Sequence, residues 1–153
     1  MSMRQEIIDY SKGDRLRGFW RLFAWRSRTA NKLLKDVQTF FLNRMAHRHG
    51  GYIGRETVFR GEPLLPHGLH GIYISRYASI GEDCCIYQNV TIGEVRRKAP
   101  QIGDHCLIGA GAVIVGDIRI GNHVRIGAGA VVSSDIPDRC TVVAQPPRVL
   151  ERK

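Results

Sequence analysis

Aliphatic residues recur at every sixth position through most of the second half of the chain. The fifth position of each six is small or aliphatic, and glycine often follows the aliphatic residue that opens the repeat. A period of six is no multiple of the 3.6-residue helical turn, and Ile, Val and Gly all lower helix propensity. Each repeat is therefore expected to form a short strand followed by a turn. The residues that open the repeats are Ile74, Ile80, Ile86, Ile92, Ile102, Ile108, Ile114, Ile120, Ile126 and Val132.

Three such strands would close one coil of about 18 residues, and stacked coils would bury a continuous column of isoleucine side chains. The pattern predicts a mainly β chain, built as a solenoid of parallel strands over residues 50–137. Cys84 and Cys106 occupy the inward fifth position, which predicts that both are small core residues rather than catalytic or metal-binding ones.

Residues 15–46 show apolar positions at roughly helical spacing, with Arg and Lys on much of the opposite side. They predict one or two helices within a basic amphipathic segment at residues 1–49, which carries 11 Lys and Arg against 4 Asp and Glu. The helices are expected to pack on the end of the solenoid or on a neighbouring subunit. The alternative is a peripheral helix on a membrane surface, because aromatic residues alternate with arginines there. These aromatic residues are Phe19, Trp20, Phe23 and Trp25.

The length of 153 residues suits one domain, and no apolar run approaches the roughly 18 residues of a membrane span. The first residues, MSMRQEIIDYSKGD, are too polar for a secretory signal. The four cysteines show no CxxC spacing, so we expect reduced thiols and a cytoplasmic protein, with membrane-peripheral attachment as the alternative. The net charge of +9 accompanies no recognised nucleic-acid-binding motif, so no nucleic acid partner is expected.

The segments LPHGLHGIYI, IGEDCCIYQNVTIG and the twice-occurring IGAGAV resemble the hexapeptide acyltransferases, and among them the serine O-acetyltransferases. The resemblance covers residues 52–152 and is closer still to relatives of those enzymes in bacterial polysaccharide gene clusters. It implies a left-handed parallel β-helix, a homotrimer, acetyl-CoA as co-substrate and no metal. It also implies a C-terminal tail, residues 138–153, that contacts CoA.

The resemblance assigns a catalytic base to the turn ahead of the repeats. The family carries Leu-Asp-His there, and matching it to Leu-Pro-His places the base at His67, with His70 as the alternative. An imidazole that titrates near neutral pH suits this role, because it must take the proton of an acceptor hydroxyl as that hydroxyl attacks the thioester. The orienting partner of His67 would be Glu56, Glu62 or a backbone carbonyl.

The resemblance also implies residues that would hold the acyl donor. The two IGAGAV faces lack bulky side chains and would leave a groove for the pantetheine arm, and the altered end motif QPPR would offer an arginine to a CoA phosphate. The candidate CoA-binding residues are Ala110, Gly111, Ala128, Ser133, Ser134 and Arg148.

The loop GEVRRKAPQ at residues 93–101 interrupts the repeat, and loops that interrupt a solenoid commonly carry function. Its cations would meet an anionic substrate or the CoA phosphates, with a plain solvated corner as the alternative. These candidate substrate-binding residues are Arg96, Arg97 and Lys98.

Two further histidines raise the alternative of a zinc site. His105 and His123 occupy the same position of repeats one coil apart, so they should stack on neighbouring coils. Some hexapeptide proteins hold zinc between subunits with three histidines, and a stacked pair supplies too few ligands. We therefore expect no metal.

Departures from the serine acetyltransferase pattern decide the expected acceptor. The aspartate ahead of the family's catalytic histidine is Pro66 here, and its histidine-orienting aspartate falls on Tyr52. The Arg-His pair that helps to hold serine falls on Lys98 and Ala99. We therefore expect an O-acetyltransferase acting on a hydroxyl of a sugar, sugar nucleotide or polysaccharide precursor. The alternatives are a serine O-acetyltransferase of cysteine biosynthesis and a non-catalytic hexapeptide scaffold.

Overall fold

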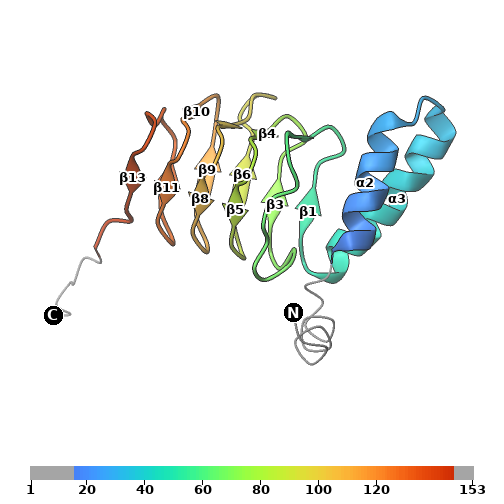
Figure 1. Cartoon of the computed structure of the whole chain (residues 1–153), viewed down its shortest axis with the longest axis horizontal. Helices are drawn as coiled ribbons and strands as arrows, with labels where there is room; N and C mark the ends of the chain where they lie inside the picture. Colours follow the sequence, from blue (N-terminus) through green and yellow to red (C-terminus); the bar gives the residue numbers. More distant parts are fainter. Residues whose placement is uncertain (1–15, 147–153) are drawn as a thin grey trace, which may run out of the picture.

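The chain folds into a pair of helices followed by a parallel β-solenoid, in a computed structural model that describes residues 16–146 (Figure 1). The helices are α2 (Arg17–Arg28) and α3 (Lys32–Arg48), which lie side by side at one end of the solenoid. The last strand lies at the opposite end. This architecture confirms the predicted mainly β solenoid with an N-terminal helical segment.

The strands of the described residues form three parallel sheets, and each coil visits sheets A, B and C in turn. Sheet A contains β1 (Tyr52–Ile53), β3 (Tyr73–Ile74), β6 (Thr91–Gly93), β9 (Val113–Val115) and β12 (Val131–Val132). Sheet B contains β2 (Val58–Phe59), β4 (Ser79–Ile80), β7 (Gln101–Ile102) and β10 (Arg119–Ile120). Sheet C contains β5 (Cys85–Ile86), β8 (Leu107–Ile108), β11 (Arg125–Ile126) and β13 (Thr141–Val142).

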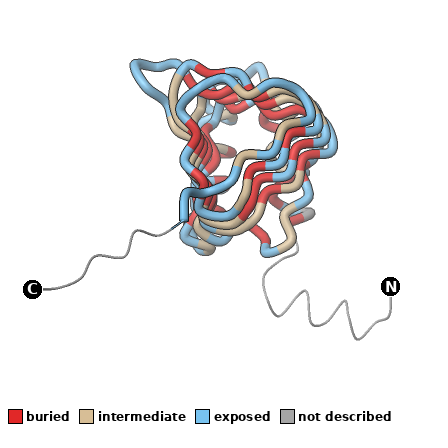
Figure 2. The backbone as a smooth tube through the Cα atoms, turned by 90° about the vertical axis from the view of Figure 1, so that its left-hand side faces the viewer, coloured by how far each residue is buried: buried red, intermediate tan, exposed pale blue. Residues whose placement is uncertain are grey.

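The isoleucines of the repeat pair directly from coil to coil. Ile74 lies opposite Ile92 in sheet A, and Ile102 lies opposite Ile120 in sheet B. Each is at most 3% exposed, because alternate residues of a strand point to opposite faces and these point inward. Figure 2 shows the stacked coils with their buried positions in register. The solenoid continues past the predicted boundary at residue 137, since β13 pairs with β11.

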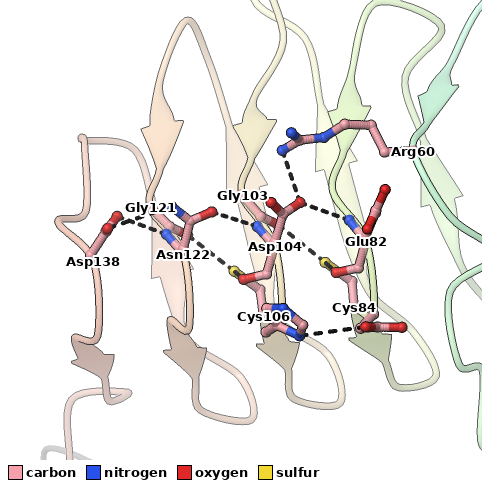
Figure 3. Close-up of polar contacts among 11 residues, drawn as sticks. Arg60, Glu82, Cys84, Gly103, Asp104, Cys106, Gly121, Asn122 and Asp138 are labelled. Atoms are coloured by element: carbon pink, nitrogen blue, oxygen red, sulfur yellow. Dashed lines mark hydrogen bonds and ion pairs between the residues drawn. The ribbon is translucent and has the colours of Figure 1, made fainter.

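The corner between sheets B and C is held by a ladder of hydrogen bonds (Figure 3). The side-chain oxygens of Asp104, Asn122 and Asp138 each accept a hydrogen bond of 2.8 Å from a backbone N–H one coil below. The donors are the amides of Glu82, Asp104 and Asn122, respectively. Each short polar side chain therefore joins its own coil to the coil that precedes it in the chain.

Cys84 and Cys106 are core residues, as predicted, and are 0% and 1% exposed. Their thiols donate hydrogen bonds of 3.2 and 3.1 Å to the carbonyl oxygens of Gly103 and Gly121 (Figure 3). A hydrogen bond with Cys106, together with burial, raises the pKa of the Cys84 thiol. Cys84 therefore stays neutral and fills space in the column.

Aromatic side chains of α2 cover the first coil of the solenoid. Phe19 and Trp20 are 1% and 8% exposed, and the rings of Trp20 and Phe23 lie 5.2 and 5.6 Å from that of Phe59 on β2. Burial of these rings stabilises the helix against the solenoid. These three aromatic residues therefore pack on the end of the solenoid, which is the first of the two arrangements expected for this segment. Trp25 is 56% exposed.

A buried arginine joins the two helices to the solenoid. Arg26 donates from Nε to Thr39 Oγ1 of α3 at 2.6 Å and from Nη1 to the carbonyl oxygen of Arg55. Burial lowers the pKa of Arg26, and the two acceptors offset part of its desolvation. None of the described helices is both long enough and apolar enough to cross a membrane.

Candidate active site

The corner between sheets C and A, the C–A corner, is a column of two-residue turns stacked from coil to coil. The second residue of each turn has a positive φ, between 59° and 69°. The turns are His70–Gly71, Gln88–Asn89, Ala110–Gly111 and Ala128–Gly129. The second residue of a turn donates its N–H to the carbonyl of the first residue one coil below, at 2.9 to 3.0 Å. The first residues of the four turns therefore share one edge of the solenoid.

His67 lies on an additional turn just before this column. Gly68 donates its N–H to the carbonyl oxygen of Leu65 at 3.1 Å, which closes a β-turn with Pro66 and His67 at its centre. Proline presets φ at the first central position, and Gly68, with φ of 59°, suits the position after the second. The His67 side chain is exposed, and its ring centroid lies 6.1 Å from that of Tyr87. The turn thus presents the imidazole outward from a stiff backbone.

His70 instead occupies a regular place in the column, equivalent to Ala110 and Ala128. Its ring centroid lies 5.0 Å from that of His49, at the end of α3, and the two rings are nearly perpendicular, at 86°. The two candidate histidines therefore have different surroundings. His70 packs against His49 at the end of α3, whereas His67 lies beside Tyr87, which follows β5 on the next coil.

Glu56 and Glu62 are the two carboxylates expected as possible orienting partners of His67. Glu56 forms an ion pair with Arg76, whose Nη2 lies 2.7 Å from Oε1, and this hydrogen bonding lowers the pKa of Glu56. Glu62 follows β2 on the corner between sheets B and C. Within residues 16–146, no hydrogen bond or ion pair joins either carboxylate to His67.

The candidate CoA-binding residues fall on two corners, on either side of sheet A. The alanines and Gly111 belong to the C–A column, where Ala128 is exposed and a Cβ built on Gly111 would meet no atom within 4 Å. Ser133 and Ser134 are exposed and follow β12 on the corner between sheets A and B, the A–B corner. Arg148 lies outside the described residues. A single chain therefore does not bring the two sets together.

The loop that interrupts the repeat forms a tight hairpin on the A–B corner. Val95 and Lys98 exchange two backbone hydrogen bonds, of 2.8 and 3.0 Å, around Arg96 and Arg97. Both arginines have a positive φ, of 52° and 66°, as in a type I′ turn, which favours Asn-Gly. Lys98 forms an ion pair with Asp117. Two exposed arginines thus occupy a backbone conformation that lowers the stability of the fold. Such strain is often found at functional sites.

His105 and His123 stack on neighbouring coils, as their spacing predicts. The ring centroids lie 4.8 Å apart with an interplanar angle of 10°. The Nδ1 atom of His105 lies 3.6 Å from an oxygen of Asp83. Within the described residues, no group of three or more His, Cys, Asp and Glu side chains could hold a metal ion.

Tyr87 and Gln88 are two residues of this corner that the sequence pattern did not indicate as candidates. Tyr87 is the aromatic neighbour of the imidazole, and Gln88 occupies the column between His70 and Ala110. The Oε1 atom of Gln88 is buried and accepts no hydrogen bond from the described residues. Both residues belong to the repeat IYQNVT, which lies one coil after the segment LPHGLHG. Counting one coil forward from the candidate histidines along the sequence would therefore have indicated them.

One surface depression of the solenoid lies away from these residues. It measures about 770 Å³, runs along the outer face of sheet B, and includes Ser79, Gln101 and Arg119 in its lining. Neither His67 nor Tyr87 lines it, and it is open to solvent. Its carboxylates, Asp135 and Asp138, accept hydrogen bonds from the backbone N–H groups of Arg119 and Asn122, and neither candidate histidine lines it.

Comparison with known proteins agrees with the solenoid fold. Residues 99–134 match the family model described as bacterial transferase hexapeptide (six repeats). Repeat and fold together define a hexapeptide-repeat chain with the left-handed β-helix of the acyltransferases. Within that class, the chain is serine acetyltransferase-like in sequence and in structure.

The similar proteins are serine acetyltransferases from several organisms. That of Staphylococcus epidermidis is 33% identical over 137 residues, 87% of this chain and 61% of the relative. The Neisseria gonorrhoeae enzyme, solved in complex with serine, has a TM-score of 0.73 and 34% identity over 86% of this chain and 55% of that one. The Entamoeba histolytica isoform 3, solved in complex with cysteine, has a TM-score of 0.68 and 30% identity over 77% and 44%.

These matches qualify the sequence-based expectations. The chain spans less than two thirds of the length of the curated relatives, 61% for the Staphylococcus epidermidis protein. The relatives are named serine acetyltransferases, so the expected closer likeness to polysaccharide-cluster enzymes gains no support from them.

Proposed function

We propose that the chain is an acetyl-CoA-dependent O-acetyltransferase with His67 as its general base. The observation that carries this proposal is the position of His67, on an exposed and stiff turn next to the column that contains Ala110 and Ala128. An edge with small side chains lets the pantetheine arm approach the backbone. The likeness to serine acetyltransferases supports the same activity.

In the proposed reaction, the neutral imidazole of His67 accepts the proton of the acceptor hydroxyl as the oxygen attacks the thioester carbonyl carbon. The new C–O bond forms, the C–S bond breaks, and the CoA thiolate takes the proton from the imidazolium. The transfer is direct and needs no acetylated enzyme. General base catalysis of this kind contributes about 10²- to 10⁴-fold. Tyr87, the aromatic neighbour of the His67 imidazole, would contact the acceptor or the acetyl group.

L-Serine is the first acceptor that we propose, because the relatives are serine acetyltransferases and one of them is solved with serine. Taken alone, the sequence favours a sugar hydroxyl over serine, because several residues differ from the serine acetyltransferase pattern, and the order of the two acceptors is now reversed. A sugar hydroxyl is the second candidate, and the residues at the expected serine-holding positions support it. Ala99 is 6% exposed and carries no polar group, and Lys98 is engaged by Asp117.

The proposed assembly is a homotrimer with its active sites between subunits. In one chain, His67 lies on the C–A corner, while Arg96, Arg97, Ser133 and Ser134 lie on the A–B corner, across sheet A. An interface between two chains would allow the C–A corner of one subunit to face the A–B corner of the next, which would complete the site for acetyl-CoA.

The experiment that tests this function measures the CoA thiol released from acetyl-CoA with L-serine, sugars and sugar nucleotides as acceptors. Release with serine that is lost in His67→Ala would support serine acetylation. Release with a sugar alone would support the second candidate. A chain that neither releases nor binds CoA would instead be a scaffold, and the proposal would be abandoned.

A further inference from the structure

The outer face of α3 exposes a set of apolar side chains, although its inner face is buried. Gln38, Leu42 and Ala46 are at most 5% exposed where the helix meets α2 and the solenoid. On the other side, apolar residues spaced three, four and seven positions apart share one face of the helix. These residues, which we call the α3 stripe, are Leu33, Leu34, Val37, Phe40 and Phe41, and they are between 39% and 76% exposed.

Exposed cations accompany the α3 stripe. Arg44 and Arg48 follow Phe40 by one and two helical turns on the same face, and Lys32 precedes the stripe. Asp36 is the single acidic residue of α2 and α3. The exposed face of α3 is therefore apolar over its first turns and cationic over its last turns, and such a face offers contacts to both the acyl-chain boundary and the anionic headgroups of a membrane surface.

We infer that the α3 stripe docks the chain onto a lipid surface that carries anionic headgroups. The helix would lie parallel to the surface, with the stripe at the boundary between headgroups and acyl chains. The stripe lies within residues 15–46, for which the sequence offered a membrane contact as the alternative. Phe19 and Trp20, two of the aromatic residues behind that alternative, face the solenoid, whereas the stripe of α3 is exposed. This inference does not depend on the proposed enzymatic function.

Charge favours the lipid surface over a second copy of the chain. Two α3 stripes packed together would bring Arg44 and Arg48 of one helix toward the cations of the other, with one Asp36 in each to offset them. An anionic surface instead attracts every one of these cations. In one chain, α3 lies at the end of the solenoid (Figure 1), and the residues of its stripe are exposed.

The test is co-sedimentation of the full chain with vesicles of phosphatidylglycerol and phosphatidylcholine, compared with vesicles of phosphatidylcholine alone. We expect binding to the anionic vesicles at low salt that weakens at high salt. The double variant Phe40→Ser with Phe41→Ser should lower the partition coefficient by about tenfold or more, because two rings no longer leave water. Arg44→Gln should lower it by about fivefold.

A control variant and a single substitution within the stripe complete the test. Val143→Ser removes an apolar side chain that is 74% exposed near the opposite end of the solenoid, and it should leave vesicle binding unchanged. Leu33→Ser, at a position 76% exposed, should also weaken vesicle binding, although it leaves the rings of Phe40 and Phe41 in place. Thermal unfolding of each variant shows whether the fold is retained.

Three results would overturn the inference. The first is the absence of binding to anionic vesicles at low salt, and the second is binding that the Phe40 and Phe41 substitutions leave unchanged. The third is self-association of the free chain that these substitutions abolish, without any vesicle binding, which would assign the stripe to a second copy.

Discussion

At the scale of single residues, positions in the C–A column differ in how far they tolerate a side chain. A Cβ built on Gly71 would lie 2.0 Å from Asn89 Oδ1, whereas one built on Gly111 would meet no atom within 4 Å. Both glycines have a positive φ, of 64° and 69°. Backbone strain is therefore common to both, and the steric clash is specific to Gly71.

Gly71→Ala should consequently lower the free energy of unfolding by more than Gly111→Ala does. The backbone term alone costs about 1–2 kcal/mol for an L-residue in this conformation, and the clash with Asn89 adds to it only at Gly71. Urea unfolding of the two variants measures both losses. Equal losses would mean that Asn89 moves aside freely.

The two histidines give the second prediction at this scale. Replacement of His67 by Ala should lower kcat for acetyl transfer by about 10²- to 10⁴-fold, because the acceptor hydroxyl loses its base. His70→Ala is the matched control, since His70 is also exposed but stands in the regular column. Its kcat should stay near that of the wild type. A larger effect of His70→Ala would move the catalytic role to that residue.

At the scale of elements, the hairpin of residues 95–98 combines strain with charge. The double variant Arg96→Asn with Arg97→Gly should raise the free energy of unfolding by about 1 kcal/mol, because Asn-Gly suits the type I′ turn. The same variant should raise the KM for acetyl-CoA or for the acceptor, since two cations are removed. Thermal unfolding and steady-state kinetics measure the two effects. A more stable variant with unchanged KM would show that the arginines bind neither substrate.

The ladder on the corner between sheets B and C gives a prediction about pH. The backbone N–H of Asn122, and then its side chain, hold the pKa of Asp138 below its usual value. A depressed pKa stabilises the fold above the unfolded-state value of about 3.9, and this stabilisation is lost as the pH falls through the folded-state value.

Asp138→Asn should therefore unfold at a lower Tm than the wild type at neutral pH. Below both pKa values the two chains should have similar Tm values, because the wild-type carboxyl is then also uncharged. Calorimetry of both chains over the acidic range measures the difference. A gap in Tm that stays constant with pH would show that the charge of Asp138 contributes nothing to the ladder.

At the scale of the whole molecule, the division of the candidate residues between two corners leads to a test of shared active sites. His67→Ala lacks the base, and Arg96→Ala with Arg97→Ala lacks the cations of the hairpin. If both variants are inactive alone and the site lies between subunits, mixed oligomers should recover about a quarter of the sites. Activity after the variants are unfolded and refolded together measures this recovery. A site contained in one chain would recover no activity.

Much of the fold could be predicted from particular residues. Isoleucines such as Ile86 and Ile108 recur in step with the coils, and they pair as expected because only the inside of a solenoid buries them together. Cys84 and Cys106 could be assigned to the core by the same count. The neighbours of His67 could not be predicted in this way. The turn around Pro66 inserts extra residues, and the six-residue repeat does not specify where inserted residues lie in a coil.

The sequence by itself determined the mainly β solenoid and the stacking of its coils. Aliphatic side chains with a six-residue period are buried together only when successive coils stack with those side chains in the interior. Only the tertiary structure decided where the insertions place their side chains. The turn before Ile74 separates His67 from the regular position of His70, and the hairpin puts Arg96 on a different corner. Packing of α2 on Phe59 likewise decided which face of the helical pair remains exposed, since periodicity shows that a helix has an apolar side but not what covers it.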